Sequence, residues 1–209
     1  MADKITTENL QDFATGATVL GTGGGGDPYV GTLMAEQAIE EYGPVDLIDP
    51  RDVPDDALVV PSAMLGAPTV MVEKMPRGTE SLDAFRSLER ALGQEAYATM
   101  SIEAGGLNST VPIAVAAQLD LPLVDADGMG RAFPEVQMVT LTLGDISASP
   151  MSIADEKGNS VFLETVDNQW AEQFARTTSI EMGGSCMIAT YPHTGSELRD
   201  HAILDSMSL

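Results

Sequence analysis

Three short segments of the sequence combine glycines with side chains that could bind or activate a small molecule. Residues 21–26 read Gly-Thr-Gly-Gly-Gly-Gly and are followed by Asp27 and Pro28. Residues 103–108 read Glu-Ala-Gly-Gly-Leu-Asn, and residues 124–134 read Val-Asp-Ala-Asp-Gly-Met-Gly-Arg-Ala-Phe-Pro. Each segment places polar groups on a backbone that another molecule can approach closely.

The glycine-rich segment 21–26 leads into a predicted helix. Asp27 is suited to cap that helix and Pro28 to occupy its first position, so the segment could present backbone N–H groups to an anion or a polar ligand. Its glycines also satisfy the G-x-G-x-x-G pattern of dinucleotide sites. The residues before it favour a helix rather than a strand, with at best 17–20 as a strand, so a dinucleotide-binding protein is the minor alternative.

Glu103 is expected at the end of a strand, before a glycine pair and the start of a helix. A carboxylate there could contact a substrate or a metal, because the glycines permit close approach. The alternative is structural: Asn108 or Ser109 caps the helix, and Glu103 is solvated.

Asp125 and Asp127 form the densest polar cluster, with a single arginine, Arg131, four residues after Asp127. Two carboxylates at this spacing after a buried strand suit Mg²⁺ or Ca²⁺, or an acid–base pair. In the alternative interpretation Asp125 accepts hydrogen bonds from backbone N–H groups and Asp127 pairs with Arg131.

Strands alternate with helices over most of the chain. Helices are expected over 7–17, 28–41, 81–92, 109–119, 168–181 and 196–203, and strands over 45–48, 57–61, 97–102, 122–125, 136–143, 151–154, 160–164 and 185–189. Residues 62–68 are expected to form a loop. This order predicts an α/β fold with a mostly parallel sheet and flanking helices, and ligands then bind at the carboxyl ends of the strands.

The composition limits the class of protein. With 10 basic and 32 acidic residues the net charge is −22, which repels nucleic acid and anionic membranes. Abundant acidic residues beside only three lysines resemble proteins of salt-loving organisms. No signal peptide or membrane-spanning run is recognisable, so a cytoplasmic protein is expected. The single cysteine, Cys186, excludes an intrachain disulfide and is expected to be a buried structural thiol.

Together the three segments LGTGGGGDPYVG, EAGGLN and VDADGMGRAFPEVQM resemble the DUF917 family, also described as the S-methyl-thiohydantoin desulfurase family. Proteins of this family are sometimes found alongside hydantoinase and oxoprolinase proteins. They have an N-terminal α/β domain followed by a β-rich domain. The resemblance therefore implies an N-terminal α/β domain over 1–167 and the beginning of a second, apparently truncated β-rich domain over 168–209.

The resemblance also implies a hydrolase that acts on the C–S bond of a five-membered thiohydantoin-type ring. We expect Asp125 and Asp127, with Glu103, to serve as the base or to bind a divalent metal. Asn108 and Arg131 are expected to contact the substrate, Arg131 by neutralising charge. The backbone amides of Gly23, Gly24, Gly25 and Gly26 are expected to hold an oxyanion or a substrate carboxylate.

A second class of function stays open beside the enzyme. The chain could be a non-catalytic ligand-binding or regulatory partner of a hydantoinase-type enzyme. For either class we expect a small-molecule ligand, no nucleic acid and no membrane, and either a homo-oligomer or association with a hydantoinase-type protein. A cavity that holds the carboxylates favours the enzyme, whereas carboxylates occupied by internal hydrogen bonds favour the binding role.

Overall fold

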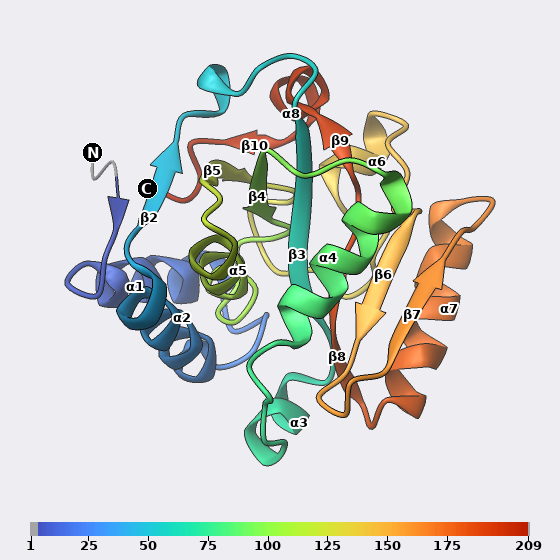
Figure 1. The fold of residues 1–209 in the computed structure, drawn as a ribbon, viewed down its shortest axis with the longest axis horizontal. Coiled ribbons are helices and arrows are strands. Elements are labelled where there is room, and N and C mark those ends of the chain that lie inside the picture. Colours follow the sequence, from blue (N-terminus) through green and yellow to red (C-terminus); the bar gives the residue numbers. More distant parts are fainter. Residues whose placement is uncertain (1–3, 209) are drawn as a thin grey trace.

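The computed structural model describes residues 4–208, apart from the side chains of Met71 and Val72, and its strands form one sheet (Figure 1). The strands are β1 (Lys4–Ile5), β2 (Val45–Ile48), β3 (Leu58–Gly66), β4 (Ala98–Ser101), β5 (Leu123–Asp127), β6 (Met151–Ala154), β7 (Ser160–Leu163), β8 (Ser185–Ala189), β9 (His193–Thr194) and β10 (Ile203–Leu204). The helices are α1 (Leu10–Gly21), α2 (Pro28–Tyr42), α3 (Pro68–Glu73), α4 (Glu80–Leu92), α5 (Val111–Leu119), α6 (Thr140–Leu143), α7 (Asn168–Glu181) and α8 (Gly195–His201), with a 3₁₀ turn at Pro50–Asp52.

The sheet is mixed, which corrects the prediction of a mostly parallel one. Its order is β1-β2-β5-β4-β3-β8-β6-β7, and the four strands β2, β5, β4 and β3 are parallel, as their alternation with helices predicts. From β3 onward the pairs β3–β8, β8–β6 and β6–β7 are antiparallel. The antiparallel half arises because β6 and β7 form a hairpin and β8 inserts between β6 and β3.

Residues 168–208 contribute the strands β8, β9 and β10 to this same sheet, and α7 packs against it. All five residues of β8 pair with β3, and three of them also pair with β6 on its other side. The segment expected to begin a second domain is therefore continuous with the α/β sheet in the residues that the structure describes. A domain boundary between residues 167 and 168 stays a prediction.

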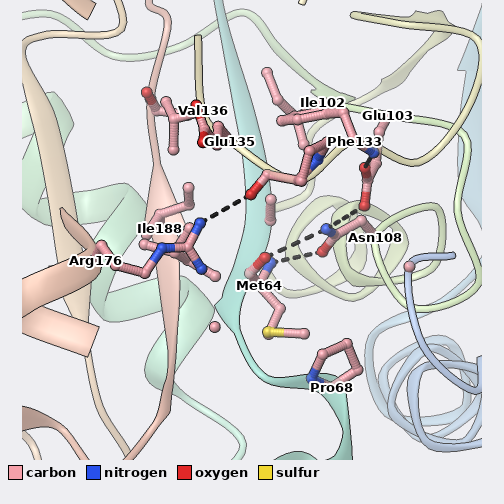
Figure 2. A pocket seen from close by; sticks show the side chains of 16 residues that line it. Met64, Pro68, Ile102, Glu103, Asn108, Phe133, Glu135, Val136, Arg176 and Ile188 are labelled. Atoms are coloured by element: carbon pink, nitrogen blue, oxygen red, sulfur yellow. Dashed lines mark hydrogen bonds between the residues drawn. The ribbon is translucent and has the colours of Figure 1, made fainter. Parts of the chain in front are cut away.

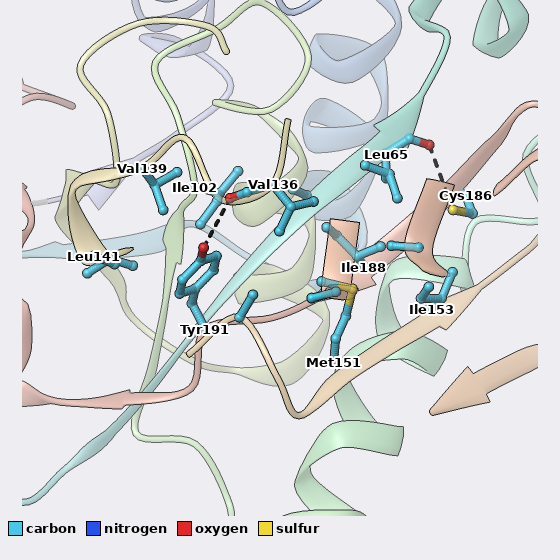
Figure 3. Close-up of a cluster of buried hydrophobic side chains, with 14 of the residues drawn as sticks. Leu65, Ile102, Val136, Val139, Leu141, Met151, Ile153, Cys186, Ile188 and Tyr191 are labelled. Carbon is cyan, nitrogen blue, oxygen red and sulfur yellow. Dashed lines mark hydrogen bonds between the residues drawn. The ribbon is translucent and has the colours of Figure 1, made fainter. Parts of the chain in front are cut away.

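Helices α4 and α7 cover opposite faces of the antiparallel half. On β8, Ala189 packs in the cluster of buried side chains that includes Phe85 and Leu88 of α4, whereas its neighbour Ile188 packs in the cluster that includes Ala171 of α7. Side chains that alternate along a strand point to opposite faces, so both faces of β8 are buried, and after Ser185 its residues are apolar. Figure 3 shows the α7-side cluster, in which the Tyr191 hydroxyl donates to the carbonyl oxygen of Val136.

The predicted strand at 136–143 is wrong. Residues 136–139 have no regular structure and 140–143 form α6. Val136, Val139 and Leu141 are buried, whereas Met138 and Leu143 are exposed. The backbone groups of the segment have partners outside a sheet: the N–H of Val136 donates to Glu172 of α7, and the N–H of Thr140 donates to the carbonyl oxygen of Gly128. Alternation alone did not distinguish a strand from an extended segment that packs under a helix.

The predicted loop at 62–68 is also wrong, because β3 continues to Gly66. Its second half pairs with β8, in a register that joins Ser62 to Ala189 and Gly66 to Ser185. That pairing comes from residues more than a hundred positions away, so local sequence carries no sign of it.

None of the helices among residues 4–208 has both the length and the apolar composition that a membrane-spanning helix requires.

His193 in β9 predicts a loss of stability in mild acid. Its ring Nδ1–H donates to the carbonyl oxygen of Tyr191 at 2.6 Å, and burial lowers the pKa of His193 from 6.5 to about 4, although the charge of Glu197 opposes the shift. The unfolded chain therefore binds a proton that the folded chain excludes, and stability present above pH 6.5 falls as the pH drops toward 4. We expect protonation of His193 in the unfolded chain to lower the free energy of unfolding by about 2–3 kcal/mol between pH 7 and pH 4.5.

Urea unfolding at pH 7 and pH 4.5 measures this effect against the His193→Gln variant. The variant should lose less stability between the two pH values than the wild type does. An identical pH dependence in both proteins would show that His193 is not the group responsible.

Candidate functional site

A cavity of about 230 Å³ lies where the loops after β4 and β5 meet the second half of β3 (Figure 2). The loop after β4 contributes Glu103 and Asn108, and the segment after β5 contributes Phe133 to Val136. Both strands belong to the parallel half of the sheet, so the cavity is at the carboxyl edge where ligands of such sheets bind. Its other side is closed by Arg176 of α7, Ile188 of β8 and Thr190, which directly follows β8.

Glu103 is the most constrained ionisable group of the cavity. Only 4% of the residue is exposed, and its Oε1 accepts from Asn108 Nδ2 at 2.7 Å while Oε2 accepts from the backbone N–H of Phe133 at 2.8 Å. Burial raises the pKa of Glu103; the two donors lower it in part, and the charge of Asp127 adds to the rise. The arrangement gives a carboxyl group whose proton affinity is higher than usual, held in one orientation at the wall of a cavity.

Asn108 holds Glu103 and ties two elements together. Its Oδ1 accepts from the backbone N–H of Met64 at 2.7 Å, and its Nδ2 also donates to the carbonyl oxygen of Met64 at 3.3 Å. The side chain thus bonds to the backbone of β3 as a neighbouring strand would and presents its remaining N–H to Glu103. It does not cap α5, whose N-cap residue is Thr110.

The glycines of 21–26 pack closely against a second glycine loop. Gly25 lines the cavity, and a Cβ placed on it would lie 2.8 Å from the Cα of Gly105. A Cβ on Gly106 would lie 2.3 Å from the carbonyl oxygen of Gly26. The other three residues predicted to bind substrate here, Gly23, Gly24 and Gly26, do not line the cavity. Close packing of the two loops thus requires glycine at several of these positions.

The strand that a dinucleotide site needs before its glycines is not present. Residues 17–20 lie within α1, which ends at Gly21, so a helix precedes the glycine-rich segment. Asp27 caps α2 as predicted: its Oδ1 accepts from the backbone N–H of Tyr29 at 2.9 Å, and Pro28 is the first helical residue. The dinucleotide alternative therefore lacks its structural context.

Asp125 and Asp127 lie at the end of β5 but do not line the cavity. Asp125 Oδ1 accepts from the backbone N–H groups of Met207 and Ser208 at 2.8 and 3.0 Å, as the structural alternative predicts. Asp127 Oδ1 accepts from the backbone of its own loop, at Met129 and Gly130. Its Oδ2 is buried and has no hydrogen-bond partner among the described residues. Their catalytic roles stay predictions.

The carboxylates as arranged do not fit a divalent cation. Backbone N–H groups already occupy one oxygen of Asp125 and one of Asp127, and both oxygens of Glu103 accept from protein donors. Among residues 4–208, outside the undescribed side chains, no three His, Cys, Asp or Glu side chains gather closely enough to hold a metal. The predicted metal stays a prediction, and we derive no chemical step through one.

The cation in the cavity is Arg176, where the sequence predicted Arg131. Arg131 is exposed, and its Nη1 donates to the neighbouring carbonyl oxygen of Ala132. Arg176 lines the cavity from α7, and Glu172, one turn earlier, accepts from its Nε at 2.8 Å. The one sequence signal that could have found Arg176 is this pairing at i and i+4 in a chain with few basic residues. Glu135 and Thr190 also line the cavity, and the sequence predicts neither of them as a site residue.

Comparison with known proteins agrees with the sequence resemblance. The model of the S-Me-THD-like N-terminal domain matches residues 8–165, and that of the S-Me-THD-like C-terminal domain matches residues 166–209. Both segments contribute to the cavity, since Glu103 lies in the first and Arg176 in the second. No curated protein matches the chain.

Among solved structures, a crystal structure of a protein from Chromobacterium violaceum has a similar fold, with a TM-score of 0.86 and 23% sequence identity. The similarity covers 99% of this chain but 59% of that protein, so the chain spans little more than half of the relative's length. With the two domain models covering residues 8–209, the chain belongs to the S-Me-THD-like family.

Proposed function

We propose that the protein is a hydrolase that cleaves the exocyclic C–S bond of an S-methyl-thiohydantoin ring. The observation that carries the proposal is Glu103, a buried carboxyl group with a raised pKa, held by Asn108 and a backbone N–H at the wall of a small cavity. Family membership supports the substrate class. The cavity of about 230 Å³ is below the range of about 300–1,000 Å³ typical of drug-sized ligands, which suits a single five-membered ring.

The reaction needs an activated water and a place for the proton. Glu103 accepts one proton as the water oxygen bonds to the ring carbon that carries sulfur. The C–S bond then breaks, and methanethiolate leaves with the proton held by Glu103, while the other water hydrogen ends on the adjacent ring nitrogen. One thiohydantoin and one water thus give one hydantoin and one methanethiol.

The environment of Glu103 suits this role. A general base is most effective when its pKa lies near the working pH, and burial raises the pKa of Glu103 in that direction. Each carboxylate oxygen has a second lone pair beside the one that accepts from the protein, so the group can still bind a water in the cavity. Asn108 acts as a positioning residue, because it fixes Glu103 Oε1 relative to β3.

A non-catalytic role in binding is the second candidate. The observation in its favour is that both oxygens of Glu103, and one oxygen each of Asp125 and Asp127, already accept hydrogen bonds from the protein. Such a protein would bind the ring without converting it. Association with a hydantoinase-type protein and self-association remain proposals for either candidate.

A thiol-release assay distinguishes the two candidates. The purified protein is incubated with S-methyl-thiohydantoin in ¹⁸O-labelled water, and methanethiol and hydantoin are quantified. The hydrolase proposal predicts equal amounts of both products, with one ¹⁸O in the hydantoin carbonyl. Saturable binding of the ring without product would instead establish the binding role, and neither binding nor product would exclude both.

A further inference from the structure

Arg176 reaches the cavity from the side opposite Glu103. Figure 2 shows its guanidinium on one side and the Glu103–Asn108 pair on the other, with Met64 between them. It is the only basic side chain among the described residues that line the cavity. About 39% of its side chain is exposed, whereas Glu103 is 4% exposed, so a ligand in the cavity lies between an inner carboxyl group and an outer cation.

The guanidinium is held in place by two partners. Its Nε donates to Glu172 Oε1 at 2.8 Å and its Nη2 to the carbonyl oxygen of Pro134 at 2.9 Å, with Glu172 Oε1 also 2.7 Å from Nη2. Glu172 is itself fixed, because its Oε2 accepts from the backbone N–H of Val136 at 2.8 Å. Arg176 is thus oriented before any ligand binds, which lowers the entropy lost on binding.

This leaves one nitrogen of Arg176 without a protein partner. A guanidinium has five N–H donors, and the two on Nη1 make no hydrogen bond to the residues that the structure describes. A partly buried, oriented cation with two free donors is matched by an oxygen acceptor on the ligand, above all one that gains negative charge.

We propose that Arg176 is a catalytic residue whose Nη1 holds the ring carbonyl oxygen of the thiohydantoin; this deepens the proposed function and rests on it. In an S-methyl-thiohydantoin the carbon that carries sulfur is joined to the ring carbonyl through a C=N–C=O conjugated system. When water adds to that carbon, the electron pair moves through the nitrogen to the carbonyl oxygen. Glu103 accepts the proton on one side of the ring while Arg176 stabilises the developing oxyanion on the other.

The partial neutralisation of Arg176 by Glu172 suits this task. An unpaired cation would bind any anion, whereas a paired guanidinium with two free donors acts through directed hydrogen bonds. A lysine at the same position would keep the charge but not the planar fork that contacts Glu172, Pro134 and the ligand at once. The proposal therefore predicts that Arg176→Lys impairs the protein although it keeps the positive charge.

The test uses two small rings that differ at the proposed contact. Hydantoin carries both ring carbonyl groups, whereas 2-imidazolidinone lacks the carbonyl that Arg176 would hold. Calorimetry measures the affinity of each ring for the wild type, Arg176→Gln, Arg176→Lys and the exposed α4 control Arg90→Gln. We expect Arg176→Gln to weaken hydantoin binding about ten- to hundredfold, as for the loss of a charge-assisted hydrogen bond, and to change 2-imidazolidinone binding less than twofold.

Turnover gives the second measurement. Removal of one donor to an oxyanion typically lowers kcat about 10²–10³-fold, so both Arg176 variants should lose kcat far more than they change KM. Arg176→Lys retains a cation beside Glu172 and keeps the test usable if Arg176→Gln does not fold. Equal loss of affinity for both rings, or no loss for either, overturns the proposal.

Binding and turnover separate this inference from the proposed function. Suppose that the wild type releases no methanethiol, but that the Arg176 variants bind hydantoin more weakly than the wild type and bind 2-imidazolidinone equally well. The hydrolase proposal then fails, and Arg176 stands as a binding contact without a catalytic role. If the variants bind and turn over like the wild type, the Arg176 role fails and hydrolysis stands.

Discussion

Glu103→Gln lowers kcat for methanethiol release by about 10²–10⁴-fold, the range typical of a lost general acid–base group. The substitution keeps the size of the side chain and removes its ability to take a proton. Both oxygens of Glu103 accept from N–H donors, so one of these donors loses its partner when the amide N–H₂ of glutamine replaces an oxygen. We expect the variant to fold with its stability lowered by about 1–3 kcal/mol. Thermal unfolding of the variant and the steady-state rate measure both expectations.

The matched control is Glu135→Gln, the same change at another carboxylate of the cavity wall. Glu135 Oε2 accepts from Gln137 Nε2 at 2.6 Å, and nothing holds Glu135 as Asn108 holds Glu103. We expect Glu135→Gln to change kcat less than tenfold. A large loss of kcat in Glu135→Gln with little loss in Glu103→Gln would contradict the assignment of Glu103 as the base.

The pH dependence carries the same prediction in the wild type. As a base, Glu103 must be deprotonated, so kcat/KM rises with pH as its carboxyl group loses a proton. The acid limb should lie above the ordinary glutamate pKa of 4.5, because burial raises the pKa of Glu103. An acid limb at or below the ordinary value would contradict the role of burial.

Gly106→Ala should destabilise the protein by about 2–3 kcal/mol, because a core that is already full must shift to accept another methyl group. The new Cβ would lie 2.3 Å from the carbonyl oxygen of Gly26 and 3.1 Å from the backbone nitrogen of Pro28. Backbone atoms cannot rotate away as a flexible side chain does, so the two loops must separate. Urea unfolding measures the loss.

The same change should also reduce turnover. Gly106 lies in the loop that carries both Glu103 and Asn108, and a displacement of about 1 Å of a catalytic group can lower a rate about a hundredfold. The control is Gly93→Ala at the end of α4, where φ is +68° and a Cβ meets no atom within 4 Å. Gly93→Ala should lower stability by about 1–2 kcal/mol through its backbone conformation alone and leave kcat unchanged. Equal effects of the two variants would argue against a steric origin.

The sequence predicted those parts of the site that depend on local order. Glu103 and Asn108 follow a buried strand and precede a helix, and that pattern places them at the carboxyl edge of a parallel sheet, where the cavity lies. Asp27 was assigned as a helix cap for a similarly local reason, since it stands directly before Pro28 at the start of α2. In each case the partners lie within a few residues or follow from the strand order.

The remaining parts depend on contacts between distant residues. Arg176 reaches the cavity because the segment that holds α7 and β8 packs against β3, a long-range pairing without a local signal. Asp125 accepts from Met207, 82 residues later, and this contact cannot be inferred from the spacing of Asp125 and Asp127. The sequence also could not show that Gly21, Gly25 and Gly26 pack against the second glycine loop at Gly105 and Gly106.

The central claim is that a hydantoin-type ring binds in this cavity between Glu103 and Arg176. A crystal structure of the protein with bound hydantoin tests it most directly. We predict that the ring lies in the cavity, with one ring carbonyl oxygen within hydrogen-bond distance of Arg176 Nη1. The other carbonyl carbon, which corresponds to the carbon that carries sulfur in the substrate, should face Glu103. Hydantoin bound elsewhere, for example in the hollow between α2 and α4 that Gln37 and Thr79 line, would contradict it.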